Sequence, residues 1–390
     1  MATASGANHS VYDIAESEYG VVPSTPAWEF IRQIGCSLAP TVDVVQSQEY
    51  VNRRVMDSEP GMIKAAGNLE MELSYGSHDD QIEAVLMGTW ARTGTKTATT
   101  ISAAADDNSL NDSADGFITA GFRAGDVVSI AGFTKETNNT TRATIATLTQ
   151  SKMTFTGAYG DGIVDEAATP SVTINSLIYR VKDGSTRRSR SIMRKFGDIS
   201  KYLVFGGGEY DKWDLKVSSP DGSPIVTGTF GIIAQSVAYA APASSTYGSR
   251  STPSPFTSIR GTLKIGGVPS AIVTEWGFSI ANGLTLQPFV GSQITGQPVS
   301  IQSTVTGNLT THFEDVANMQ KMIAGTTTSF EHEMQDAAGN KLKFVFPKIK
   351  LTGAPLDVKG GAPIAQALSF TAHEDTTTDA VVYIERTPAA

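Results

Sequence analysis

The chain has 390 residues, enough for two or three domains with a sizeable core, and a formal net charge of −9. Only 18% of its residues are charged, while Gly, Ser, Thr, Ala and Val are abundant, which is typical of β-structure with many turns. An acidic chain repels nucleic acid, and the single cysteine, Cys36, excludes a disulfide framework within the chain. No run of about 18 apolar residues and no basic-then-apolar start occurs, so we expect neither a membrane span nor a secretory signal.

In chain order, residues 1–25 are small and polar and predict a flexible N-terminal arm. Residues 28–38 fit either a helix or an extended segment, and residues 42–55 predict a strand. Strict alternation over residues 66–75 predicts a clearer strand. One face of that strand holds Leu69, Met71, Leu73 and Tyr75, and the other holds Asn68, Glu70, Glu72 and Ser74.

A short helix is expected to follow this strand. Ser77 is suited to cap its N-terminus, and the carboxylates of Asp79 and Asp80 favour the positive end of a helix. The apolar side chains at helical spacing are Ile82, Val85, Leu86 and Trp90.

The same pattern of strand, turn and helix occurs twice. Residues 67–90 read GNLEMELSYGSHDDQIEAVLMGTW, and residues 307–327 read GNLTTHFEDVANMQKMIAGTT. The second helix is expected over residues 316–323. The chain therefore predicts two similar β-rich halves, each with one short helix.

Between residues 95 and 178, Thr, Ala, Asp and Asn dominate, and short strands are expected at 125–133, 141–149, 152–159 and 172–179. Strands of this length separated by Gly, Asn and Asp turns indicate a small all-β barrel or sandwich. We therefore expect a core of residues 26–94 and 179–390 that is interrupted by an inserted domain at 95–178.

Two further segments have unusual compositions. Residues 180–196 are basic and include Arg187, Arg188 and Arg190; a solvated strand or an interface with an acidic neighbour is favoured over phosphate binding, because no aromatic residues alternate with the charges. Residues 241–258 are rich in Pro and Ser and lack periodicity, which is typical of a functional or flexible loop.

No pattern of catalytic, metal-binding or cofactor-binding residues stands out. The histidines have no metal-ligand spacing, and Asp106, Asp107 and Asp112 do not fit a calcium loop. The glycines at 206–208 lack the Lys and helix of a phosphate loop and indicate a bend or bulge. We expect a protein that is not an enzyme and needs no cofactor.

Residues 47–90, SQEYVNRRVMDSEPGMIKAAGNLEMELSYGSHDDQIEAVLMGTW, resemble the major tail tube proteins of long-tailed, siphovirus-like bacteriophages. The resemblance continues in VTGNLTTHFED (305–315) and DAAGNKLKFVFPKIKLTGAP (336–355). It implies a tail-tube β-sandwich or barrel with two pseudo-duplicated halves, short flanking helices and a small inserted all-β domain.

The resemblance further implies stacked homohexameric rings that form the tail tube of the virion, assembled in the host cytoplasm. Its partners would be the tail tip or baseplate, the tail terminator and, in the lumen, the tape measure protein. Double-stranded DNA would pass without specific binding, and an acidic wall would keep it sliding. The inserted domain would face outward, because a bulky insert would block the pore.

Specific residues follow from this expectation. We expect Asn68, Glu70, Glu72 and Ser74 to face the lumen, the competing interpretation being contact with a neighbouring subunit or the outside. Contacts between subunits or rings are expected from the N-terminal arm, loop 50–62, Tyr247, Arg250, Pro253, Pro255, Arg187, Arg188 and Arg190. The alternative function is a β-rich tail adhesin or carbohydrate-binding component, which would leave the duplication unexplained.

Overall fold

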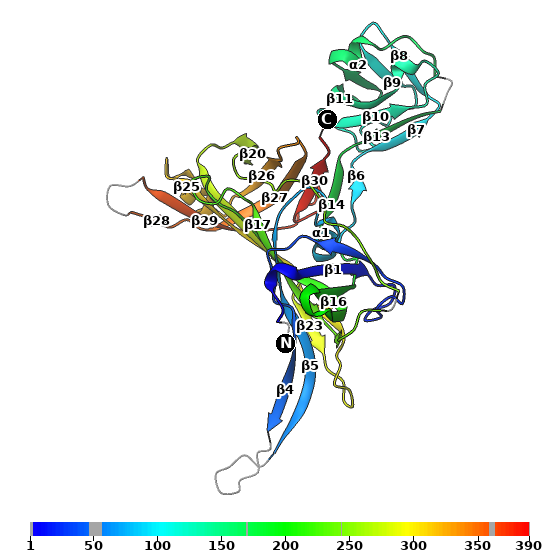
Figure 1. The fold of residues 1–390 in the computed structure, drawn as a ribbon. Coiled ribbons are helices and arrows are strands. Elements are labelled where there is room, and N and C mark those ends of the chain that lie inside the picture. Colours follow the sequence, from blue (N-terminus) through cyan, green and yellow to red (C-terminus); the bar gives the residue numbers. More distant parts are fainter. Residues whose placement is uncertain (1–2, 47–56, 169–170, 243, 359–362, 390) are drawn as a thin grey trace. The chain divides into compact units, whose positions relative to one another are not determined.

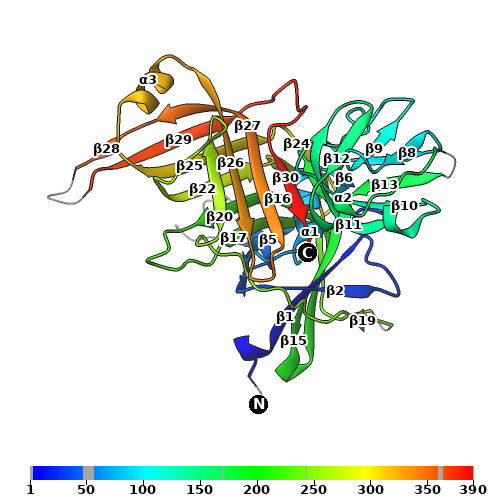
Figure 2. The same ribbon diagram turned by 90° about the horizontal axis from the view of Figure 1, so that it is seen from above.

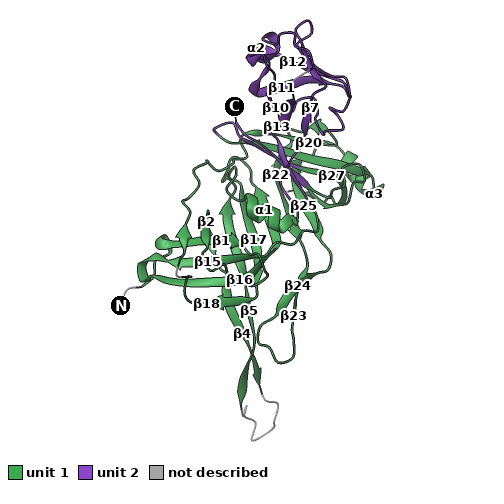
Figure 3. Ribbon diagram, turned by 90° about the vertical axis from the view of Figure 1, so that its right-hand side faces the viewer, with its two compact units in different colours: residues 1–88, 183–336, 345–382 green, residues 89–182, 337–344, 383–390 purple. Residues whose placement is uncertain are grey.

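The computed structural model describes residues 3–46, 57–168, 171–242, 244–358 and 363–389. Much of the expected strand at 42–55 and of loop 50–62 lies outside these residues. The chain divides into two compact units, which Figure 3 shows in different colours. Unit 1 comprises residues 1–88, 183–336 and 345–382, and unit 2 comprises 89–182, 337–344 and 383–390.

Unit 1 is built almost entirely of strands (Figure 1). They are β1 (His9–Ala15), β2 (Ala27–Ile31), β3 (Gly35–Cys36), β4 (Ala39–Gln46), β5 (Ser58–Glu72), β15 (Arg190–Phe196), β16 (Lys201–Val217), β17 (Thr227–Ala234), β18 (Ser236–Ala238), β19 (Thr246–Tyr247), β20 (Gly261–Ile265), β21 (Val268–Pro269), β22 (Val273–Ala281), β23 (Leu284–Gln287), β24 (Gly296–Ser300), β25 (Thr304–His312), β26 (Thr327–Gln335), β28 (Leu356–Asp357) and β29 (Ala365–Ala372). β27 (Lys341–Gly353) begins in unit 2 and ends in unit 1. The helices of unit 1 are α1 (Asp79–Leu86) and α3 (Ala317–Ile323).

Unit 2 contains β6 (Ala91–Arg92), β7 (Thr95–Ala98), β8 (Ile101–Ala104), β9 (Ser109–Asp112), β10 (Val127–Ala131), β11 (Thr140–Leu148), β12 (Lys152–Phe155), α2 (Gly157–Asp161), β13 (Val172–Ser176), β14 (Tyr179–Lys182) and β30 (Tyr383–Thr387). The expectation of a mainly β protein with few short helices is confirmed.

One antiparallel sheet runs through unit 1 in the strand order β4, β5, β17, β16, β22, β25, β29. Its inner face is apolar because side chains alternate along each strand. One row of register partners on that face is Leu69, Phe230, Trp213, Ile280 and Val305, all of them buried. Burying these residues supplies the main driving force for folding this unit.

β16 belongs to two parts of this unit. Its first half pairs with β15 and β18, and its second half pairs with β17 and β22. The strand changes direction at Gly206–Gly208, as the sequence predicts: Gly207 has a φ of 66°, which favours glycine. A Cβ at Gly208 would lie 2.7 Å from the carbonyl oxygen of Arg190, so the backbones approach too closely for a side chain.

The two halves of unit 1 repeat the same connectivity. β4 pairs with β5 as β22 pairs with β25, and β5 pairs with β17 as β25 pairs with β29. β1 pairs with β15 and β2 as β20 pairs with β26 and β21. We call β1–β5, α1 and β15–β17 repeat 1, and β20–β22, β25, α3 and β26–β29 repeat 2.

A shared irregularity supports the equivalence of the repeats. The β16–β17 register shifts between Tyr210 and Lys212, and the β27–β29 register shifts between Leu351 and Gly353. Each strand therefore contains one extra residue at the same place, a β-bulge. Gly353 is consequently the counterpart of Lys212.

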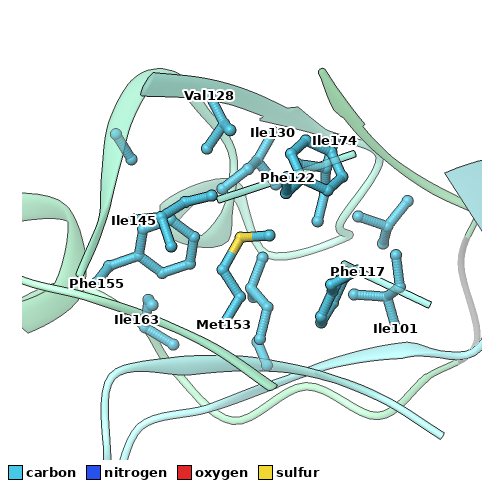
Figure 4. Close-up of a cluster of buried hydrophobic side chains, with 14 of the residues drawn as sticks. Ile101, Phe117, Phe122, Val128, Ile130, Ile145, Met153, Phe155, Ile163 and Ile174 are labelled. Carbon is cyan, nitrogen blue, oxygen red and sulfur yellow. The ribbon is translucent and has the colours of Figure 1, made fainter. Parts of the chain in front are cut away.

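Unit 2 has its own sheet in the order β7, β13, β10, β11, β12, β9, β8. Figure 4 shows the apolar cluster between its strands, in which Phe117, Phe122 and Met153 are fully buried. The acidic residues near its turns pair with lysines: Asp107 with Lys152, and Asp112 with Lys96 at 2.5 Å.

Two local expectations are wrong. Residues 9–15 are not part of a flexible arm, because they form β1 between β15 and β2, with Val11 and Asp13 fully buried. His78 rather than Ser77 occupies the N-cap position of helix α1, without a side-chain capping hydrogen bond. The helix ends at Leu86, before Trp90, because Met87 adopts a left-handed conformation.

Two buried histidines make the fold sensitive to acid. Burial lowers the pKa of both His78 and His332 from 6.5 to about 4. The unfolded chain therefore takes up protons below pH 6.5 that the folded chain does not, so stability is present above pH 6.5 and is lost as the pH falls towards 4. Each histidine contributes up to about 3 kcal/mol of this loss.

His332→Gln tests this dependence. The Nε1–H of Trp276 donates to Nδ1 of His332 at 2.9 Å, and a glutamine oxygen can accept the same bond without titrating. Urea unfolding at pH 7, 5.5 and 4.5 should show a flatter acid limb for the variant than for the natural chain. Equal losses in both proteins would contradict the assignment.

Candidate assembly surface

The outer face of the unit 1 sheet is a continuous polar surface that crosses both repeats. Three rows of register partners define it, and we call it the polar face. They are Glu70, Thr229, Asp214, Ser279, Thr306, Thr371 and Lys350; then Glu72, Thr227, Lys216, Gly277, Asn308, Ser369 and Gly353; then Asn68, Gly231, Lys212, Ala281 and Thr304. Apart from the glycines, every member is exposed or half-buried.

The polar face is close to electrically neutral. Its rows contain three carboxylates and three lysines, and the remaining positions are mostly Thr, Ser, Asn and Gly. Lys212 and Asp214 pair at 2.8 Å. The acidic wall expected from the net charge of the whole chain is therefore not a property of this surface.

The polar face is hollowed near its centre. A cavity of about 670 Å³ is lined by residues of β16, β22, β25 and β29, among them Lys216, Asn308 and Thr371. A Cβ at Gly307 would lie 2.2 Å from the Phe370 ring, and one at Gly277 would lie 2.8 Å from the carbonyl oxygen of Leu215. Side chains at these two positions would displace the groups beneath them.

The four residues expected at the lumen do not behave alike. Asn68 and Glu70 are exposed on the polar face and Glu72 is half-buried there, but Ser74 is only 3% exposed. The assignment of Ser74 to the exposed row is wrong, because its Oγ accepts from Arg32 at 3.0 Å and donates to Ser77 at 2.8 Å. That network ties the end of β5 to the start of α1.

The Pro/Ser-rich loop lies against repeat 1. β19 pairs with β2 in parallel, and the amide of Gly248 donates to the carbonyl oxygen of Trp28 at 2.7 Å. The carbonyl oxygen of Pro253 accepts from Arg32, and Pro255 forms a bridge with Ser74. Arg250 is exposed and lines a cavity of about 340 Å³ with Glu72, and Tyr247 lies on β19 under Lys195. Contact of this loop with a neighbouring subunit stays a prediction.

Two arginines of the basic segment 180–196 form ion pairs with carboxylates of unit 1. Arg187 pairs with Glu209, and Arg188 pairs with Glu83 at 3.4 Å. These ion pairs account for the positive charges without a second subunit, and the expected contact with a neighbour stays a prediction.

Arg190 is the centre of a buried ionic cluster. Its guanidinium donates to both oxygens of Asp13 and lies 3.1 Å from Asp80 and 3.3 Å from Glu29. Burial alone would lower the pKa of Arg190, but the charge of Asp13 and its hydrogen bonds raise it above the ordinary value. Burial, reinforced by a hydrogen bond with Asp80, raises the pKa of Glu29 to about 7. This cluster fastens α1 to β1 and β15.

Two hairpins extend from the sheet and expose apolar side chains. β4 and β5 form one hairpin, and β23 and β24 form the other, which points in the same direction (Figures 1 and 3). The amide of Ile63 donates to the carbonyl oxygen of Gln293 at 2.9 Å, so the hairpins touch. Among the described residues, their exposed large apolar side chains are Val42, Val44, Val45, Phe289, Val290, Ile294 and Val299.

The sequence matches the model of the phage tail tube protein family over residues 6–372. The chain belongs to the phage tail tube protein family. No curated protein sequence matches it. Membership in this family makes the chain a structural component of a phage virion that assembles into a tube with other tail proteins. None of the helices described is long and apolar enough to cross a membrane, and no cluster of metal-ligating side chains occurs in the described ranges.

Sequence reasoning found one strand of the polar face and missed the rest. The alternation in residues 66–75 identified Asn68 and Glu70, but the partner rows come from segments up to 300 residues away along the chain. The GNL motif at 307–309 was the available signal, because Asn308 occupies in β25 the place of Asn68 in β5.

Arg190→Met should destabilise the tail tube subunit by about 3–5 kcal/mol, because it leaves Asp13 buried without its partner charge. Arg188→Met is the matched control; its ion pair is more exposed, and its loss should cost less than about 1 kcal/mol. Urea unfolding of both variants measures the difference. Similar costs would show that the Arg190 cluster does not fasten α1.

Proposed function

We propose that the chain polymerises as stacked hexameric rings into the hollow tail tube of a long-tailed, siphovirus-like phage, through which DNA reaches the host. The observation that carries this proposal is the polar face, which is a single surface across both repeats. A conduit needs a continuous wall, and the sheet supplies one without an interruption between the repeats.

The composition of the polar face suits DNA passage. Tight binding to the phosphate backbone depends on unpaired Lys and Arg that release counterions. Here the lysines are balanced by carboxylates, and Thr, Ser, Asn and Gly fill most of the remaining positions. The wall would therefore neither hold nor strongly repel the DNA.

The two hairpins supply the surface for stacking. Phe289, Val290 and Ile294 are exposed together on the loop of the β23–β24 hairpin, and exposed apolar groups of this kind mark interaction sites. Contact of both hairpins with the next ring would cover them. The ends of the tube would meet the tail tip and the terminator, and the lumen would hold the tape measure protein before ejection.

The number of subunits in a ring has two candidate values. The resemblance implies six, but each subunit contains the repeat twice, so three subunits already place six repeats around a ring. The mass of an isolated ring distinguishes them, and either value is compatible with a tube. Unit 2, which contains the whole of the expected inserted domain at 95–178, is proposed to face outward. Assembly would take place in the host cytoplasm without a cofactor or a catalytic step.

Negative-stain electron microscopy of the purified chain, alone and with native tail tips as seeds, tests the proposal. Rings or hollow tubes with a stain-filled pore are the expected result. A chain that stays monomeric with seeds would contradict it. Binding to a glycan array by such a monomer would favour the adhesin.

The double variant Glu70→Lys and Glu72→Lys tests the role of the polar face. It adds positive charge to the wall without changing a buried group, so tubes should form but DNA delivery should slow by at least tenfold as phosphates are retained. Glu18→Lys with Asp221→Lys changes the charge equally at exposed sites outside the face and should leave delivery unchanged. Infectivity per assembled particle is the measurement, and equal values for both variants would remove these residues from the lumen.

A further inference from the structure

Unit 1 contains one internal junction between its repeats. The second half of β16, from Lys212 to Val217, pairs with β22 from Ala281 to Trp276. This pairing joins repeat 1 to repeat 2 through their backbones.

Helix α1 covers this junction. The side-chain amide of Asn282 donates to the carbonyl oxygens of Val85 at 2.8 Å and Tyr210 at 3.2 Å, and its backbone amide donates to Asp211. Val85 is fully buried. The first residue after β22 thus meets the C-terminal turn of the helix from the other repeat.

In repeat 2, the counterparts of the second half of β16 and of α1 are the β28 segment and α3. No other repeat covers these two elements in the described part of the chain. Val358 is the counterpart of Val217, because Gly353 corresponds to Lys212 across the shared bulge; it is 65% exposed. Ile323 is the counterpart of Val85, since each is the seventh residue after its helix N-cap, and it is 82% exposed. Helix α3 has no buried residue (Figure 2 shows it at the periphery, beside β28 and β29).

Repeat 1 has the complementary elements free at its own outer edge. Leu69 and Leu309 are the leucines of the two GNL motifs, and their register partners are Cys36 and Trp276, respectively. Cys36 is therefore the counterpart of Trp276. Six residues further along the chain in each repeat, Val42 is the counterpart of Asn282. Val42 is 50% exposed, and Val44 beside it is also exposed. The described residues contain no third repeat that could cover either edge.

We infer that the α3/β28 edge of one subunit binds the β4 edge of a second copy of this chain, in the arrangement of the internal β16–β22 junction. Ile323 of one copy then contacts Val42 of the next, an apolar contact in place of the hydrogen bond between Val85 and Asn282. Because the two surfaces differ, each subunit binds one neighbour through its α3/β28 edge and another through its β4 edge. Such a head-to-tail contact closes into a ring when the rotation between neighbouring subunits is a whole fraction of a turn. This inference rests on the proposed function and names the surfaces that close the ring.

Charged substitutions at the two surfaces test the junction in the full chain. Ile323→Asp and Val42→Asp change exposed side chains, so thermal unfolding of the monomer should be unaffected. Each variant should raise the concentration needed for assembly, measured by sedimentation velocity, at least tenfold. Ile118→Asp, at an exposed apolar site in unit 2, is the matched control and should assemble normally.

Mixing the two variants gives a sharper result. Each retains one intact surface, so an equimolar mixture should form heterodimers and nothing longer. In a second experiment, Val42→Cys mixed with Ile323→Cys should give a disulfide-linked dimer on oxidation, whereas Val42→Cys mixed with Ile118→Cys should not.

The outcomes separate this inference from the proposed function. Normal rings from Ile323→Asp, or no cross-link between the Val42→Cys and Ile323→Cys chains, would overturn the junction and leave the tube standing. A natural chain that stays monomeric with native tail tips would overturn both.

Discussion

The whole of unit 1 depends on the backbone hydrogen bonds of one strand. β16 pairs along its length with four other strands, and it can do so because the glycines at 206–208 let it leave one part of the sheet and enter another. Buried backbone N–H and C=O groups must be hydrogen-bonded, so the position of β16 fixes the register of each strand that pairs with it. This fixed register determines which side chains form the polar face and which form the apolar layer beneath it. It also joins the two repeats into one sheet.

The duplication explains both the symmetry of the fold and its departures from symmetry. Both repeats retain the bulge and the Gly-Asn-Leu strand, but among the described helices only α1 is fastened to charged groups of the sheet. Asp80 forms an ion pair with Arg190, and the side-chain amide of Gln81 donates a hydrogen bond to Asp13. α3 has one side-chain hydrogen bond to the sheet among those described, from Asn318 to Gln366; none of its residues is buried, and Ile323 is 82% exposed. The helix that meets the other repeat is buried, and the helix without a neighbouring repeat is exposed. That contrast is the basis of the junction proposed between neighbouring subunits.

The electrostatics also separate the polar face from the rest of the molecule. The net charge of −9 belongs to the whole chain, whereas the polar face has equal numbers of acidic and basic residues. Local register decides which charges share a surface, and composition does not contain that information. A member of the phage tail tube protein family can thus have an acidic chain and a nearly neutral polar face.

The sequence by itself determined the local features of this protein. Alternation located β5, helical spacing located α1 and α3, glycines located the bend in β16, and the repeated GNL motif showed the duplication. These signals are short-range, because periodicity and turn chemistry act over a few neighbouring residues. The family also followed from motif order along the chain.

Only the tertiary structure decided which segments meet. Residues 9–15 have the composition of a flexible arm, but they form a strand because they pair with β15. The alternation of the sequence places Ser74 on the exposed side of β5, but its hydroxyl is buried in hydrogen bonds with Arg32 and Ser77. Arg190 lies in a basic segment that is typical of a surface patch, but its guanidinium is buried in an ion pair with Asp13, which is far away along the chain. Pairing between distant strands depends on burial and register across the whole fold, and no window of the sequence contains both partners.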